Sequence, residues 1–283
     1  MNAKDRGCGL SLMKRGISVV LGLLALGCLN GTIIRPCLGW GPISAQYWEE
    51  ATITTEPHHA SDDDYATLVA QLKSQNAADR REAAEKLGYL EDRRAVEPLL
   101  PLLKDQDSDV RAATVDALGF LGDQRAVEPM ITLLNDGVAF VRSAAARVLG
   151  QLKDARAVDP LISVLKDSNP SVRGAAAIGL GALKQGRAVP ELIAAAKDEA
   201  PDVRTAVASA LGMLKDARAV DSLLVLVNDE YKAVKVTAAL SLADIGDKRA
   251  IPALNEAVAA EKDEEARSQM KEALQRLMAA REQ

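Results

Sequence analysis

Residues 92–122 read DRRAVEPLLPLLKDQDSDVRAATVDALGFLG, and the residues that follow repeat this stretch. Residues 123–153 read DQRAVEPMITLLNDGVAFVRSAAARVLGQLK, and residues 154–184 read DARAVDPLISVLKDSNPSVRGAAAIGLGALK. The same frame covers residues 61–277 as seven units of 31 residues without an insertion. Self-similarity at a constant period of this length is typical of a solenoid, in which each unit covers the hydrophobic side of its neighbour.

Each unit predicts two helices when its positions are numbered 1 to 31. Hydrophobic residues at positions 5, 8, 9 and 12 predict a first helix over positions 4–13, and those at 19, 23, 26, 27 and 30 predict a second helix over positions 17–30. Asp at position 1, for example Asp92, is expected to accept a hydrogen bond at the start of the first helix. Asn76, Asp107 and Asn169 are the expected N-caps of the second helix, and Pro170 and Pro201 suit its first turn.

The recurring letters D-x-R-A-V-x-P-L, L-K-D, V-R-x-A-A and A-L-G-x-L resemble the HEAT-repeat superfamily. They are most similar to the short HEAT-like repeats named after phycobilisome (PBS) lyases. The resemblance covers about three quarters of the chain. It implies an all-α solenoid of seven two-helix repeats over residues 61–283 but indicates little about function, because one fold serves many functions.

Two polar positions recur in nearly every unit, an Asp at position 14 and an Arg at position 20. They include Asp105, Arg111, Asp136, Arg142, Asp167, Arg173, Asp198 and Arg204. A repeated charge can form a binding stripe, but a polar group needed identically in every unit is one that the stacking itself requires. The family resemblance implies a hydrogen-bonded ladder between adjacent units, so we interpret these residues as structural.

Function is expected where the units differ, on the solvent side of the second helix, which lines the concave surface in HEAT-type solenoids. Positions 18, 21, 25 and 29 carry the candidate binding residues Tyr89, Phe120, Phe140, Arg147, Ile178, Met213 and Leu240, with Val236 among the same positions. Large hydrophobic side chains on an exposed face favour a binding surface for a protein or peptide. Tyr89 and Phe120 occupy equivalent positions in adjacent units and should be close neighbours. The alternative is a phase error of one residue, or cover by neighbouring units.

Composition supports this interpretation. Aromatic residues make up 3% of the chain, so the core must consist of Ala, Leu and Val, which suits closely stacked helices. The formal charge is −5, and residues 46–283 alone carry 30 Lys and Arg against 39 Asp and Glu. This acidity argues against a nucleic-acid partner, because phosphate binding needs a basic surface.

The first 45 residues predict a signal peptide or membrane-targeting segment. Lys14 and Arg15 precede the uncharged run ISVVLGLLALG, and Met13 is an alternative start. Cys28 is a candidate for lipidation and Ala45 is the competing cleavage position; one acyl chain would give only weak membrane association. We therefore expect export to the periplasm or cell envelope. Residues 46–60 are expected to be a linker, either a plain tether or a cover for the first repeat through Trp48.

Few residues suggest chemistry. The two histidines, His58 and His59, lie in the predicted linker, and no helix carries His and Glu at metal-ligand spacing. We therefore predict no catalytic residues, no metal and no cofactor. The expected function is a monomeric, non-catalytic scaffold for protein interaction. The alternative is an enzyme or enzyme accessory of the PBS-lyase or oxidoreductase-like type, related to a lyase or a hydroxylase. The charged first and last units are expected to cap a complete array.

Overall fold

The structure is a computed structural model that describes residues 62–279. These residues belong to a compact unit that spans residues 57–283, and within the described range they form helices and turns without a β-strand. The predicted targeting segment, residues 1–45, and the predicted linker, residues 46–60, lie outside the described residues. The same holds for Cys28, Ala45, Trp48, His58 and His59.

Fourteen α-helices follow one another as seven pairs within residues 62–279. Their bounds are α1 Asp62–Gln71, α2 Ala77–Tyr89, α3 Val96–Leu99, α4 Ser108–Leu121, α5 Val127–Leu133, α6 Ala139–Leu152, α7 Val158–Val164, α8 Pro170–Leu183, α9 Val189–Ala195, α10 Pro201–Leu214, α11 Val220–Leu226, α12 Lys232–Ile245, α13 Ile251–Ala260 and α14 Glu264–Ala279. Each pair corresponds to one sequence unit, so the predicted all-α solenoid of seven two-helix repeats is confirmed.

The first helix of a unit differs from the prediction at both ends, and in units 3 to 6 it stops at position 11. Positions 2–4 form a turn of 3₁₀-helix, such as Gln124–Ala126, and the α-helix proper begins at position 5. In five units this turn is capped by the Asp at position 1, whose carboxylate accepts a hydrogen bond from the amide two residues later, but unit 5 forms the same turn after Gln185 without a side-chain cap. Asp123 accepts from the Arg125 amide at 2.9 Å, for example. The hydrogen bond satisfies a free amide at the start of the turn, and 3₁₀ turns are common at such helix ends.

The second helix matches its predicted range, since α4 covers positions 17–30 of its unit. Asn76, Asp107 and Asn169 accept hydrogen bonds from backbone amides of the helices that follow them, as predicted. Pro170 and Pro201 stand at the first positions of α8 and α10, where the missing amide hydrogen removes no helical bond.

The core runs through the array as one continuous cluster. Its largest fully buried members include one leucine at position 27 of five successive units: Leu87, Leu118, Leu149, Leu180 and Leu211. Thr114, also fully buried, donates its hydroxyl to the Val110 carbonyl at 2.7 Å, so this polar group is satisfied inside its own helix.

Glycine at position 28 allows successive second helices to approach each other closely. A Cβ atom on Gly150 would lie 2.4 Å from the Gly179 Cα, and one on Gly88 would lie 2.6 Å from the Ala117 Cα. Real Cβ atoms do not come this near to backbone atoms, so only glycine fits here without a shift of the neighbouring helix. The spacing of the stack therefore depends on residues that contribute no side chain.

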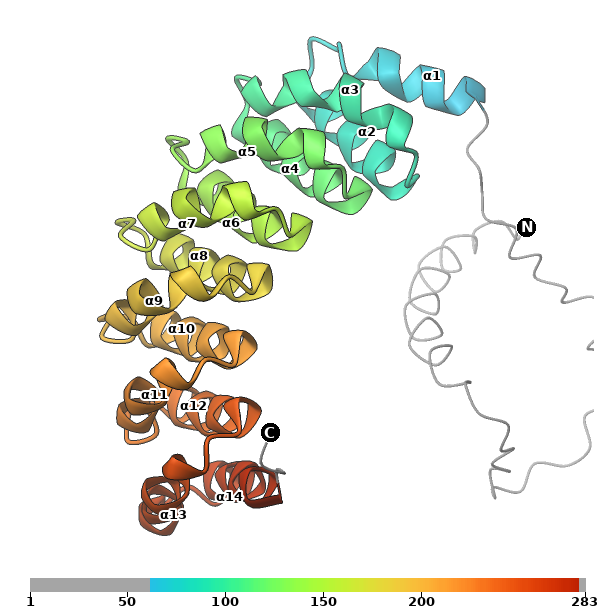
Figure 1. Cartoon of the computed structure of the whole chain (residues 1–283). Helices are drawn as coiled ribbons and strands as arrows, with labels where there is room; N and C mark the ends of the chain where they lie inside the picture. Colours follow the sequence, from blue (N-terminus) through green and yellow to red (C-terminus); the bar gives the residue numbers. More distant parts are fainter. Residues whose placement is uncertain (1–61, 280–283) are drawn as a thin grey trace, which may run out of the picture. The chain divides into compact units, whose positions relative to one another are not determined.

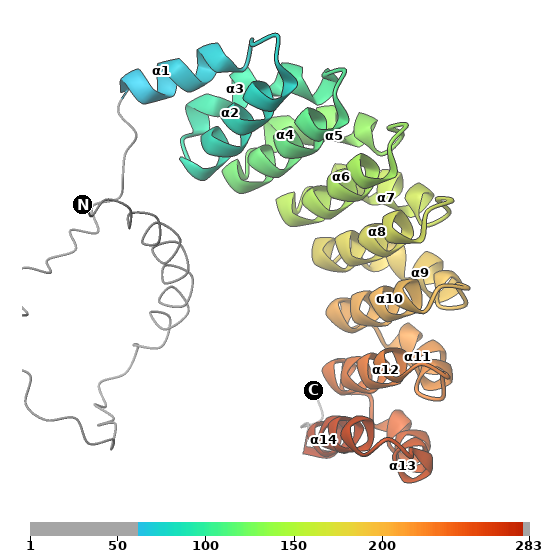
Figure 2. The same ribbon diagram turned by 180° about the vertical axis from the view of Figure 1, so that it is seen from behind.

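The seven pairs stack side by side along an arc (Figure 1). From α3 onward the odd-numbered helices lie on the outer side of the arc and the even-numbered helices on its inner side, in both views (Figures 1 and 2). The second helices thus present their exposed positions toward the inside of the curve. No helix among residues 62–279 combines the length and hydrophobicity needed to cross a membrane.

Candidate functional site

An arginine–aspartate ladder joins adjacent units along one edge of the array. Each rung links the Arg at position 20 of one unit to the Asp at position 14 of the next, and the pairs are Arg80–Asp105, Arg111–Asp136, Arg142–Asp167, Arg173–Asp198 and Arg204–Asp229. In every rung the arginine Nε lies 2.7 Å from the carboxylate Oδ2. The second contact, from Nη2 to Oδ1, makes each pair bidentate, which is the strong geometry for these groups.

The ladder also holds the loop between the two helices of a unit. Arg142 Nη1 donates to the Asp136 carbonyl of its own unit at 2.8 Å, while the Asp136 carboxylate accepts from the Val138 amide at 2.9 Å. The hydrogen bond from Arg142 holds the pKa of Asp167 below its ordinary value, and Arg80 does the same to the pKa of Asp105. The guanidinium and carboxylate groups of the ladder are largely buried and already hydrogen-bonded. They therefore have few donors or acceptors left to bind a ligand.

The last rung has a different composition. Lys235 occupies the arginine position in α12, and its Nζ pairs with Glu261, which follows the longer helix α13. Glu261 lies one residue beyond the usual Asp position, and its second oxygen accepts from the Lys262 and Asp263 amides. The pair therefore keeps the link between units although the loop has changed.

The predicted aromatic pair lies on the surface. Tyr89 is 71% exposed and Phe120 is 60% exposed, yet their ring centroids are 5.4 Å apart with an angle of 35° between the planes. Each ring projects from the last turn of its second helix, α2 or α4. Two rings that contact each other while both face solvent form a ready hydrophobic anchor for another molecule.

Two other predicted residues, Arg147 and Ile178, line a hollow on the second helices of units 3 to 5. The hollow has a volume of about 350 Å³ and is lined by Arg147, Gly174, Ala175, Ile178, Asp202 and Ala206 among others. Small side chains at positions 21 and 22 create the space, because a Cβ atom on Gly174 would meet only Ala206, at 3.8 Å. Arg147 is exposed and pairs with Asp116 of the preceding unit at 2.5 Å. The hollow offers a hydrophobic floor with charges at its rim.

The remaining predicted residues are more dispersed. Phe140 is 48% exposed but stands near the start of α6, about eleven residues along the helix from the position of Tyr89 and Phe120, or roughly 16 Å at 1.5 Å per residue. Met213 is 39% exposed, and its sulfur lies near Gly181. Leu240 is half-buried against the core. The structure therefore brings Tyr89 and Phe120 together and places Phe140 apart.

Val236 does not belong to the exposed set, and the expectation for this residue is wrong. It is buried in the core cluster. Position 21 lies at the border of the exposed face, since the residues there in units 2 to 5 (Ala112, Ser143, Gly174 and Thr205) are all half-buried. A branched side chain at such a border reaches inward and packs with the core.

Sequence reasoning missed a row of lysines at position 31. These lysines directly follow α6, α8 and α10. All three adopt the left-handed backbone conformation, with φ of 55° at Lys153, 53° at Lys184 and 53° at Lys215. Gly122 and Gly246 take this position in the flanking units. A residue other than glycine in this region costs about 1–3 kcal/mol, whereas a cation at a helix C-terminus recovers about 0.3–1 kcal/mol. The repeated LK before each connection was the available signal.

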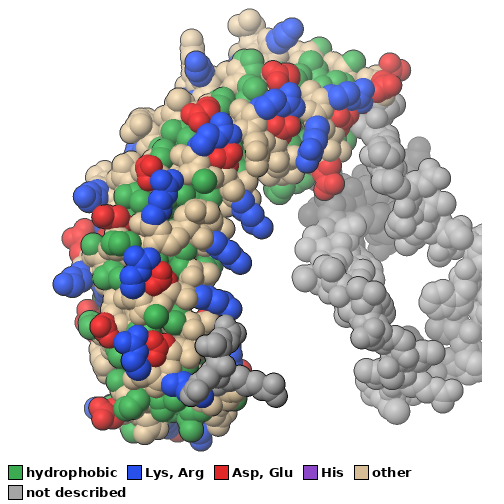
Figure 3. Space-filling view, viewed as in Figure 1, with side chains coloured by type: hydrophobic (Ala, Val, Ile, Leu, Met, Phe, Trp, Pro, Cys, Tyr) green, Lys and Arg blue, Asp and Glu red, His purple; other side chains and the backbone are tan. Residues whose placement is uncertain are grey.

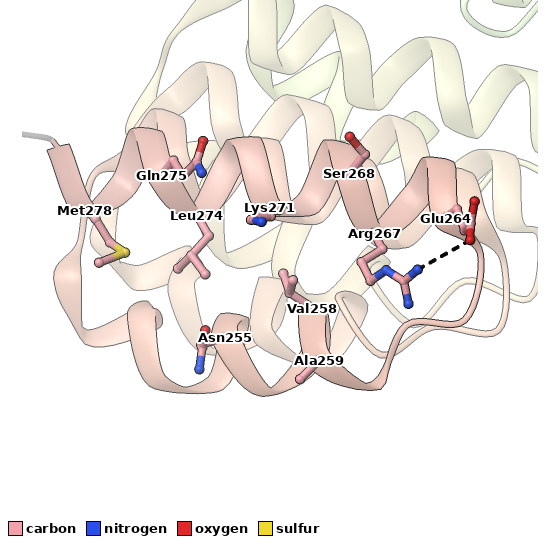
Figure 4. A pocket seen from close by; sticks show the side chains of 10 residues that line it. All are labelled: Asn255, Val258, Ala259, Glu264, Arg267, Ser268, Lys271, Leu274, Gln275 and Met278. Carbon is pink, nitrogen blue, oxygen red and sulfur yellow. Dashed lines mark ion pairs between the residues drawn. The ribbon is translucent and has the colours of Figure 1, made fainter.

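A second, larger cavity of about 680 Å³ lies between α13 and α14 (Figure 4). Val258 and Leu274 project into it, and Arg267 beside it pairs with Glu264 at 3.9 Å. Leu274 occupies position 28, which is glycine in the first five units. Another helix could not pack against α14 at this position as closely as the second helices of the first five units pack against one another. The surface at the C-terminal end of the array therefore differs from the interface that repeats between units.

Within residues 62–279 no group of three or more His, Cys, Asp or Glu side chains is arranged to hold a metal ion. The carboxylates of the ladder are engaged by arginine, as described above. The exposed features of the second helices are thus an aromatic pair, a shallow hollow and a basic row. Such features suit contacts with another molecule's surface.

Comparison with known proteins agrees with the fold. No curated protein matches the chain in sequence. The solved structure of YibA from Escherichia coli is 21% identical, with a TM-score of 0.59, and the match covers 78% of this chain and 83% of YibA. The complex of CpcE and CpcF of phycocyanin lyase from Nostoc sp. PCC7120 is 20% identical, with a TM-score of 0.52, covering 88% of this chain and 100% of that one. At these identities the likeness concerns the fold alone.

The match to a family model is more extensive. The model of HEAT repeats matches residues 65–150, 139–211 and 189–275, which together exceed half of the chain. These ranges coincide with the stacked helix pairs and their ladder. The chain belongs to the HEAT-repeat family.

Proposed function

We propose that the array is a non-catalytic scaffold that binds a protein or peptide on the exposed side of its second helices, with Tyr89 and Phe120 as the main anchor. The observation that carries this proposal is the exposure of both rings despite their mutual contact. Aromatic residues are enriched where interfaces gain most of their binding energy. The polar groups of the ladder are already hydrogen-bonded to one another. The exposed aromatic pair is therefore the surface feature best suited to recognition.

The hollow around Ile178 supports an extended contact. It lies on the same helix layer, two units beyond Phe120, and its small side chains give room for a protruding group of a partner. Arg147 and Asp202 at its rim can orient polar groups of that partner. A chain of similar fold has been solved in the complex of CpcE and CpcF of phycocyanin lyase, which is consistent with a protein partner for this array.

We further propose that the protein is exported to the periplasm or cell envelope, with weak membrane association through its N-terminal segment. The support is the basic and then hydrophobic pattern of residues 14–27. Cell fractionation followed by mass spectrometry of the mature N-terminus tests it. A mature protein that begins at Cys28 with an acyl chain, or at Gln46, is the expected result. An intact cytosolic N-terminus would contradict it.

The binding function is tested by site-directed crosslinking in cells. A photo-crosslinking amino acid at position 120 should capture a partner that the same group at position 225 does not capture. Val225 is the matched control because it is 71% exposed but belongs to α11 in the outer layer. The captured partner is then purified and titrated against the wild-type chain.

The direct measurement uses the double variant Tyr89→Ala/Phe120→Ala. We expect its affinity for the purified partner to fall at least tenfold, because anchor residues typically contribute about 2 kcal/mol or more each. Val225→Ala should bind like the wild type. Equal affinity of the double variant and the wild type would remove Tyr89 and Phe120 as the anchor.

A further inference from the structure

The C-terminal ends of the second helices form a continuous edge with one hydrophobic end and one basic end. We call this the C-terminal edge and define it by Tyr89, Phe120, Lys153, Lys184 and Lys215. The aromatic residues stand at position 29 of units 1 and 2, and the lysines stand at position 31 of units 3, 4 and 5. All three lysines are exposed, and no ion pair of theirs is present among residues 62–279.

We infer that the C-terminal edge binds an extended acidic peptide segment of a partner, with a hydrophobic residue on Tyr89 and Phe120 and carboxylates on the three lysines. This inference rests on the proposed function, because it specifies the partner for the same surface. Packed helices lie about 8–10 Å apart, so the lysines recur at about that spacing. An extended peptide rises about 3.3 Å per residue, so carboxylates at every third residue match the row.

The charge of the rest of the molecule strengthens this choice. Residues 46–283 carry more acidic than basic groups, 39 against 30, so an acidic segment is repelled by most of the surface. Lys and Arg side chains project from the inner side of the arc beside α6, α8 and α10 (Figure 3). A local basic row on an acidic protein favours one register of an acidic partner and speeds its association.

The backbone distinguishes this lysine row from another one in the array. Glycine fits position 31 better than lysine does, as Gly122 and Gly246 illustrate with φ of 63° and 78°. Three consecutive units nevertheless carry lysine in the left-handed conformation, and Glu91 takes the same conformation at position 31 of unit 1, with φ of 53°. A second lysine row at position 13, Lys104, Lys166 and Lys197, is equally exposed but has no such strain and no aromatic neighbours in the same edge. The position 13 row is therefore a matched control for charge alone.

The test uses the full chain and a dye-labelled peptide of about 15 residues, since the edge from Tyr89 to Lys215 spans roughly 40 Å, or about 12 extended residues. The peptide carries one tryptophan and then glutamate at every third position between glycine and serine. A second peptide has the same composition with its glutamates in one block. The variants are Lys153→Gly/Lys184→Gly/Lys215→Gly and, as control, Lys104→Gln/Lys166→Gln/Lys197→Gln.

We expect the position 31 triple variant to bind the spaced peptide at least tenfold more weakly than the wild type, with a smaller dependence on salt. Its melting temperature should not fall, because glycine suits the backbone, so weaker binding cannot be attributed to unfolding. The control variant should bind the peptide within about twofold of the wild type, because its lysines lie outside the edge.

Three results would overturn the inference: equal binding by the position 31 variant, equal or tighter binding of the block peptide, or binding of anionic phosphatidylserine vesicles without binding of the peptide. The last result would assign the lysines to a membrane surface instead. If the captured partner still requires Tyr89 and Phe120 while the lysine variant binds it normally, the acidic segment is wrong and the proposed function stands. If neither variant affects the partner, both fail.

Discussion

The N-terminal and C-terminal ends of the second helices differ in how much their side chains vary from unit to unit. At the N-terminal ends, five successive arginines make the same bidentate bond to an aspartate of the next unit. At the C-terminal ends the exposed side chains vary: position 29 is aromatic in units 1 and 2, and position 31 is lysine in units 3 to 5. The constant end joins units that must pack identically, whereas the exposed positions 29 and 31 at the other end differ between units. The difference separates residues that maintain the stack from residues available for recognition.

Breaking one rung should have the largest effect. Asp167→Ala leaves the largely buried Arg142 guanidinium without its carboxylate, and we expect a loss of about 3–5 kcal/mol in the free energy of unfolding. Asp159→Ala in the same unit is the control, because its pair with Arg187 is exposed and such pairs contribute about 0–1 kcal/mol. Urea unfolding followed by circular dichroism measures both. A similar small loss for both variants would contradict the structural role of the ladder.

A change at position 28, where successive second helices approach closely, should cost less. Gly150→Val places a side chain where a Cβ atom would lie 2.4 Å from the Gly179 Cα, and we expect a loss of about 1–3 kcal/mol from overpacking. Gly137→Val is the control, since a Cβ atom there meets nothing within 4 Å. Thermal unfolding of both variants checks this. Unchanged stability of Gly150→Val would mean that close helix approach is not required.

Acid should weaken the constant end selectively. Arg80 and Arg142 lower the pKa of Asp105 and Asp167 through their hydrogen bonds, so the folded state binds protons less readily than the unfolded state. This contribution to stability is present above the unfolded aspartate pKa, about 3.9, and is lost as the pH falls through the folded values. We expect unfolding midpoints to drop as the pH falls below about 4, and less steeply in Asp167→Asn. Parallel curves for the two proteins would contradict this.

The smallest effect on stability is expected at the variable end. Tyr89→Ala/Phe120→Ala removes exposed rings, so the free energy of unfolding should change by less than about 1 kcal/mol. Equilibrium unfolding in urea of the double variant beside the wild type measures this. A loss as large as that of Asp167→Ala would show that the aromatic pair supports the stack and would end the distinction between the two helix ends.

Sequence periodicity predicted the elements and the faces of this protein well. The range of α4, the caps at Asn76, Asp107 and Asn169, and the exposure of Tyr89 and Phe120 follow from which positions repeat and which vary. These features depend on contacts within a unit or on the period itself. Local patterns determine such contacts.

The features that sequence reasoning missed depend on distances between units. Three features can be predicted only when the distance between neighbouring helices is known. They are the closeness of Gly150 to the next helix, the hollow beside Gly174 and the burial of Val236. The length of the sequence repeat does not give that distance. The 3₁₀ turns after the position 1 aspartates are a local feature, but the hydrophobic pattern there fits either helix type. The lysine row was readable but carries meaning only once its backbone conformation is known.

Helix α1 contains no buried residue, and its charged contacts with the second unit, such as Asp62 with Arg94, are exposed. Within residues 62–279 no unit precedes it to supply a rung. In a stack held by nearest-neighbour contacts, local opening requires the least energy at such an end. A mechanical load applied through the N-terminus would therefore peel α1 away before it separated the laddered helices, and amide exchange should be fastest there. The first helix would act as a weak link that yields while the remaining array keeps its curvature.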